Sequence, residues 1–110
     1  MSDVRVARKA LVLRILEGGG KSSHFERQAA FNDSGLAGAI GTLVDKVAMH
    51  AYRVTDDDIS AARASGLSED QVFEIVVCAA VGQATRQYDA AMAALDAATD
   101  KGEYAAPNSR

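Results

Sequence analysis

The hydrophobic positions of this chain recur at the three- and four-residue spacing of α-helices, and short breaks rich in glycine, serine or asparagine separate the segments. Three consecutive glycines end the first segment, and serine or threonine stands at the start of two of the next three, where side-chain oxygens cap a helix. The first four predicted helices cover about Asp3–Glu17, Ser23–Phe31, Leu36–Ala51 and Thr55–Gly66.

A fifth helix is predicted to open at Ser68, which forms a capping box with Gln71. Nearly every residue from Val72 to Val81 is apolar, and a helix that is apolar on all sides is expected to be buried. The β-branched residues of this run would also suit a strand, but the preceding cap and the helical spacing that continues to Leu95 favour a helix. A short chain covers such a segment poorly, so we expect another copy to cover part of this helix or of the third.

The length of 110 residues predicts one domain, with an all-α fold of about five helices. We place this single domain at residues 1–99. Residues 100–110 contain glycine, proline and asparagine, and we expect them to form a flexible C-terminal tail. Apolar residues make up 48% of the chain and charged residues 25%, which is typical of a folded globular protein.

The net charge of −3 argues against nucleic acid or an anionic membrane surface as a partner. No apolar run approaches the length of about 20 residues that spans a bilayer. The basic first segment, interrupted by Arg14, fits an amphipathic helix better than a targeting peptide. One cysteine, Cys78, excludes an internal disulfide and fits a cytoplasmic protein.

Two short motifs suggest ligand chemistry but have simpler explanations. The segment Gly18–Ser22 resembles part of a phosphate-binding loop, but Ile15 stands where that motif requires glycine and a helix precedes it, so we interpret it as a polar linker. The acidic run Asp56–Asp58 cannot converge on one ion, because consecutive helical side chains diverge; it fits the first turn of a helix. His24 and His50 are too far apart in sequence for a metal motif, so we expect no metal and no cofactor.

The remaining candidates lie in the last helix. Cys78 falls within the most apolar stretch, where burial would suppress the reactive thiolate, so we interpret it as structural. An intermolecular thiol function of Cys78 is the weakest hypothesis that we retain. Arg86 follows Gly82 where the helix becomes polar, and could bind an anionic ligand or form an ion pair, including one between subunits.

The stretches Val44–Thr55 and Ala61–Glu74 together resemble the AhpD-like/carboxymuconolactone decarboxylase superfamily. Its members carry an Ala-Arg-x-x-Gly-Leu-Ser turn, here Ala62–Ser68, before a long apolar helix with a glycine in its middle, here Gly82. The resemblance covers about residues 36–97. It implies an all-α, AhpD-like fold and a homo-oligomer.

The resemblance also places the family's redox motif, Cys-x-x-Cys-x-x-x-His, on residues 51–58. The two cysteine positions hold Ala51 and Val54, and the histidine position holds Asp58. Alanine and valine cannot attack a peroxide or form a disulfide, so the thiol cycle of the family is not expected in this chain.

Two functions follow as hypotheses. The first is a non-redox AhpD-like protein that forms oligomers and has a small-molecule-binding or scaffold role. The second is a carboxymuconolactone decarboxylase-like enzyme acting on a small organic acid, with Asp58 or His50 as the base. In that case Arg53 or Arg86 would hold the carboxylate of the substrate.

Overall fold

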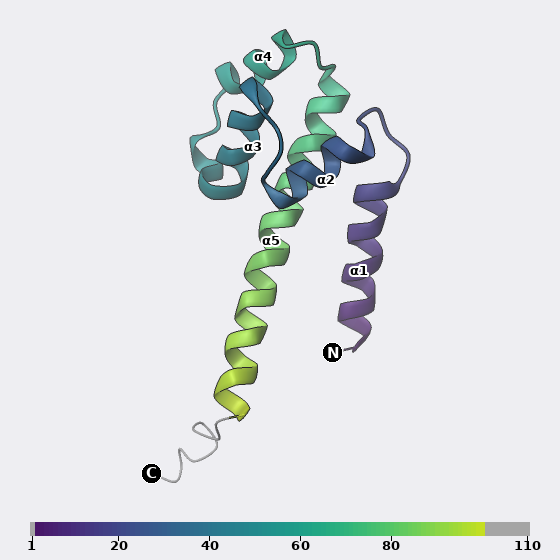
Figure 1. Cartoon of the computed structure of the whole chain (residues 1–110), viewed down its shortest axis with the longest axis vertical. Helices are drawn as coiled ribbons and strands as arrows, with labels where there is room; N and C mark the ends of the chain where they lie inside the picture. The colour runs from purple at the N-terminus through teal and green to yellow at the C-terminus, as the bar shows by residue number, and fades with distance from the viewer. Residues whose placement is uncertain (1, 101–110) are drawn as a thin grey trace.

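A computed structural model describes residues 2–100 of the chain, with side-chain detail from residue 6. These residues form five α-helices and one 3₁₀ turn without strands, which confirms the all-α prediction (Figure 1). The elements are α1 (Ser2–Glu17), α2 (His24–Asn32), α3 (Gly38–His50), η1 (Ala51–Arg53), α4 (Asp56–Ala64) and α5 (Glu69–Asp100). None of the helices within residues 2–100 is both long and apolar enough to cross a membrane.

Side-chain caps set the start of three helices, as the sequence predicted. Ser23 accepts a hydrogen bond from the Glu26 amide and receives the Glu26 side chain on its own amide, and Thr55 forms the same reciprocal pair with Asp58. Ser68 and Gln71 exchange equivalent bonds at the start of α5. Each pair satisfies backbone donors that the first helical turn leaves free.

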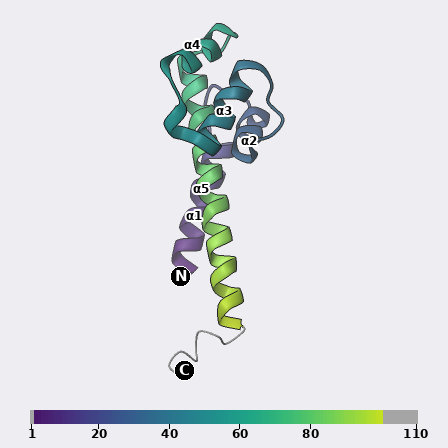
Figure 2. The same ribbon diagram turned by 90° about the vertical axis from the view of Figure 1, so that its left-hand side faces the viewer.

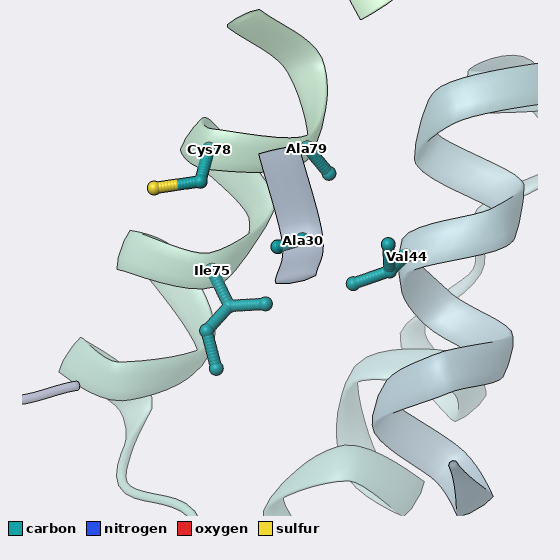
Figure 3. Packing of buried hydrophobic residues seen from close by; sticks show 5 residues of the cluster. All are labelled: Ala30, Val44, Ile75, Cys78 and Ala79. Carbon is teal, nitrogen blue, oxygen red and sulfur yellow. The ribbon is translucent and has the colours of Figure 1, made fainter. Parts of the chain in front are cut away.

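The core lies where α5 crosses α2 and α3. In one cluster, Ile75, Cys78 and Ala79 of α5 meet Ala30 of α2 and Val44 of α3, and Figure 3 shows the Cys78 sulfur turned away from Val44. A second cluster joins Leu43, Ala62 and Val72 from α3, α4 and α5. Small side chains dominate both clusters, so the helices approach closely.

The closest approach of two helices occurs at Gly82. A Cβ built on Gly82 would lie 1.9 Å from the carbonyl oxygen of Phe31, in the last turn of α2. Only a glycine lets the two backbones meet at this distance. The mid-helix glycine that the sequence singled out therefore has a packing role.

Two predicted features differ in the structure. The third helix begins at Gly38 rather than Leu36, because Ala37 is extended and Gly38 has a φ of +70°; Leu36 reaches the core from the preceding loop. The apolar run of α5 is buried on one face only, and the side chain of Phe73 is 67% exposed. Within one chain the run is therefore not buried on all sides, because the remaining helices cover a single face; its cover by another copy stays a prediction.

Helix α5 is much longer than its neighbours. At about 1.5 Å per residue, its 32 residues rise about 48 Å, and its C-terminal half extends beyond α2, α3 and α4 (Figure 2). Of the other helices, only α1 lies beside that half, and it runs in the opposite direction (Figure 1). Helix α5 includes Asp100, which the sequence assigned to the tail; the rest of the predicted tail, residues 101–110, lies outside the described part of the chain.

Candidate functional site

Asp58, which the resemblance aligns with a histidine, lies in the first turn of α4. It accepts hydrogen bonds from the Thr55 amide at 2.9 Å and from Lys46 Nζ, which lies 2.9 Å from both carboxylate oxygens. The bond from Lys46 is the largest cause that lowers the pKa of Asp58, and the Thr55 amide adds to it. An ionised carboxylate held in this way caps a helix well and is a weak proton acceptor.

The other predicted site residues do not gather around Asp58. His50 ends α3 with an exposed side chain whose ring meets Tyr52 edge-on, with 6.0 Å between centroids. Arg53 ends η1 and is also exposed. Arg86 lies on α5 and donates to the Phe31 carbonyl at 2.6 Å and to Gln83 Oε1 at 3.0 Å, so its guanidinium caps the end of α2.

The two positions that the resemblance aligns with cysteines lie apart from Cys78. Ala51 and Val54 flank the 3₁₀ turn after α3, whereas Cys78 lies in the middle of α5. Cys78 is 1% exposed, and its Sγ is 3.8 Å from the Ile15 carbonyl of α1. Burial raises the pKa of the Cys78 thiol to about 11; Arg27 lowers it and Glu74 raises it further. At neutral pH the thiol is therefore protonated and unreactive.

The structure contains a buried polar cluster that the sequence reasoning missed. Glu74 of α5 accepts hydrogen bonds from three donors in the loop between α1 and α2: the amides of Lys21 and Ser22 and the hydroxyl of Ser22. These distances range from 2.7 to 2.9 Å. Burial alone would raise the pKa of Glu74, but the loop donors and nearby Arg27 outweigh it and hold the pKa below its usual value.

Arg27 of α2 is the cationic member of this cluster, and only 4% of it is exposed. Its Nη1 donates to the carbonyls of Ile15 and Gly18 at the end of α1, and its Nη2 donates to the Ser22 carbonyl at 3.0 Å. The Nε–H has no hydrogen-bond partner in the described residues. A buried donor without a partner destabilises a fold by about 1–3 kcal/mol.

A cavity of about 170 Å³ lies beside the cluster, between α1, α2 and α5. Its polar wall contains Arg14, Arg27, Glu74 and Cys78, and its apolar wall contains Ile15, Phe73 and Val77. His50, Arg53, Asp58 and Arg86 do not line it. Within residues 2–100 no group of three side chains is placed to hold a metal ion.

One sequence signal could have led to this cluster. Glu74 is the single charged residue within the apolar run Val72–Val81, and a charge in a buried helix requires partners. No comparable signal identifies Arg27, because its partners are backbone carbonyls of a different segment. Its burial depends on how α1 and α2 meet.

A second feature is an apolar groove between α1 and the middle of α5, lined by Leu11, Val81 and Thr85 among others. Arg8 also lines this groove and forms an ion pair with Asp89, with 3.2 Å between nitrogen and oxygen. Its guanidinium carbon lies 4.9 Å from the centre of the Tyr88 ring. Beyond Asp89, α5 continues for another eleven residues, to Asp100, and no residue of that stretch is fully buried. The apolar side of α5 thus extends past its covering helix.

No protein-family model, curated protein or solved structure matches this chain. The resemblance to the AhpD-like superfamily stays a prediction.

Proposed function

We propose that this protein is a non-redox, AhpD-like helical protein that self-associates through the paired helices α1 and α5 and serves as a scaffold. The observation that carries the proposal is an apolar stripe on α5 that leaves the core and continues past Asp89. Its members are Val81, Thr85, Tyr88, Met92 and Leu95.

The stripe has the spacing of a helix–helix seam. Its members are separated by alternating steps of four and three residues, so they lie along one side of α5. Helix α1 covers the first part, at Val81 and Thr85, whereas Leu95 remains 50% exposed. An apolar seam that extends beyond its intrachain cover favours a partner helix of the same kind.

A second copy of the chain supplies such a helix. Helix α1 exposes apolar side chains at Val6, Leu11 and Leu13, which are 51–66% exposed. Two α1–α5 pairs packed together would form a four-helix arrangement that buries the α5 stripe together with Val6 and Leu13, which lie seven residues apart on one side of α1. The charges on the two helices support this pairing, because α1 is mainly basic and α5 is mainly acidic.

Exposed basic side chains lie on α1 at Lys9 and Arg14, while the end of α5 carries Asp96 and Asp100. When α1 of one copy lies beside the end of α5 of another, opposite charges meet at the rim of the apolar contact. Such complementarity orients an interface and excludes like-charged alternatives.

Thiol chemistry has no place in the proposed function. Ala51 and Val54 occupy the cysteine positions implied by the resemblance, and Cys78 is buried with a raised pKa. The polar cluster around Glu74 holds the helices together and offers no second sulfur. The proposal therefore rests on surfaces rather than on a reactive group.

Sedimentation of the full chain at about 100 µM tests the proposal, with dimer formation expected at about twice 11.5 kDa. Leu95→Glu places a charge in the seam and should weaken association at least about tenfold. Ala90→Glu is the matched control, since Ala90 is exposed and about 180° around α5 from the stripe. A monomeric wild type, or equal effects of the two variants, would contradict the proposal.

A further inference from the structure

The cavity between α1, α2 and α5 has the size of a small organic ligand. Its volume is about 170 Å³, and an apolar protein cavity of about 150 Å³ accepts a benzene molecule. Ile15, Phe73 and Val77 supply an apolar wall. Phe73 and Arg14 are exposed residues, so the cavity opens to solvent on their side.

Arg27, in the polar wall, has one N–H group without a hydrogen-bond partner among the described residues. Arg27 lines the cavity and is 4% exposed, and its Nε–H is the part of the guanidinium that makes no hydrogen bond. The Nη groups already donate to backbone carbonyls, which fixes the orientation of the side chain. Nε itself is closed off from the accessible surface, so a ligand in the cavity meets the positive charge of Arg27 rather than this donor.

The charges around the cavity favour a monoanion. Arg27 and Glu74 carry opposite charges, and the oxygens of Glu74 are engaged by the loop donors. Cys78 is uncharged at neutral pH. Arg14 remains as the excess positive charge at the open side, and its side chain makes no ion pair within the described residues.

We propose that this cavity binds a small monocarboxylate whose apolar part is about the size of a six-carbon ring or chain. The carboxylate pairs with Arg14 and faces the positive charge of Arg27. The apolar part packs against Ile15, Phe73 and Val77. The cavity lies within one copy of the chain and shares only Arg14 with the proposed self-association surface, so it does not depend on association.

Titration of the full-length protein with sodium benzoate, followed by two-dimensional NMR, tests this site. We expect a dissociation constant of about 0.1–1 mM, since a ligand of this size gains limited binding energy. The Arg27 Nε–H signal should shift together with the Val77 methyl signals. Benzamide, which has the same shape without the charge, should bind about tenfold more weakly.

Three variants sharpen the test. Arg14→Gln removes an exposed charge and should weaken benzoate binding about tenfold, whereas Arg63→Gln, an exposed arginine on α4 outside the cavity, should leave it unchanged. Val77→Phe fills the cavity and should abolish binding, with circular dichroism confirming the helical fold. Arg14→Gln keeps the proposal testable if Val77→Phe fails to fold.

Several results would overturn the proposal. One is that the Arg27 and Val77 signals do not shift at about 10 mM benzoate. Another is that benzoate and benzamide bind with equal affinity. Inorganic phosphate binding as tightly as benzoate would indicate a general anion site without a role for the apolar wall. Benzoate affinity unaffected by both Arg14→Gln and Val77→Phe would place the ligand elsewhere.

Discussion

Gly20 lies in the loop after α1, against the side chains of Arg27 and Glu74. A Cβ built there would lie 2.9 Å from Arg27 Nη2 and 3.0 Å from Glu74 Oε2. Both side chains are held by hydrogen bonds, so neither can retreat without losing one. The adjacent Gly19 has no such neighbour within 4 Å.

Gly20→Ala should therefore lower the free energy of unfolding by about 1–3 kcal/mol, because the methyl group displaces a buried hydrogen-bonding partner. Gly19→Ala is the matched control and should change it by less than about 0.5 kcal/mol. Urea denaturation monitored by circular dichroism measures both. Equal losses in the two variants would show that the loop needs glycine for its flexibility and not for this contact.

Asp33 is a residue whose charge opposes folding at neutral pH. It ends α2 in the left-handed conformation, with a φ of 53°. Burial is the largest cause that raises the pKa of Asp33 from 3.8 to about 6; the carboxyl of Asp45 raises it further and Arg86 lowers it. One of its oxygens, Oδ1, is buried and has no hydrogen-bond partner among the residues that the structure describes. The folded state thus binds a proton more tightly than the unfolded state, so stability falls as pH rises from about 4 to about 6.

Asp33→Asn should raise the free energy of unfolding at pH 7 by about 1 kcal/mol and change it little at pH 4. Asparagine tolerates the left-handed conformation, so the backbone is unaffected. Unfolding by urea at a series of pH values gives both quantities. A stabilisation of equal size at both pH values would mean that charge is not the cause.

At the scale of the elements, the contact between α2 and α5 depends on the lack of a side chain at Gly82. The Phe31 carbonyl that faces it also accepts the Arg86 guanidinium, so the end of α2 is held from two neighbouring turns of α5. A methyl group at Gly82 would push the two backbones apart and weaken this bond.

Gly82→Ala should lower the free energy of unfolding by about 1–3 kcal/mol or more, because backbone atoms cannot yield. Helix propensity alone predicts the opposite sign, a gain of about 1 kcal/mol. Ala80→Gly, at an exposed position of the same helix, measures that propensity directly. Thermal unfolding followed by circular dichroism compares them, and a stabilised Gly82→Ala would exclude the close approach.

The helix boundaries were predictable where they depend on neighbouring residues. Ser23, Thr55 and Ser68 cap their helices through residues three positions away, so a short stretch of sequence contains the whole signal. The start of α3 was misplaced because Leu36 reaches the core from an extended segment. The apolar side chain of Leu36 therefore indicates that the residue is partly buried, but it does not indicate that the residue is helical.

At the scale of the whole molecule, the polar cluster could not be predicted because it joins segments far apart in sequence. Lys21 and Glu74 are separated by 53 positions, and their contact requires α1, α2 and α5 to be arranged first. The chain's local pattern predicts five helices but not which loop meets which helix. Among the predicted residues, Asp58 caps α4 and Arg86 binds the end of α2, whereas His50 and Arg53 are exposed.

The loop that ends at Ser22 has a consequence for nucleotides. Its glycines, lysine and serine supply the amides that elsewhere surround a phosphate, but here Glu74 of the protein's own core helix takes the amides of Lys21 and Ser22. A phosphate would have to compete with an anion that is covalently part of the chain and always present at the site. While Glu74 stays hydrogen-bonded there, the amides of Lys21 and Ser22 are not free to bind a phosphate.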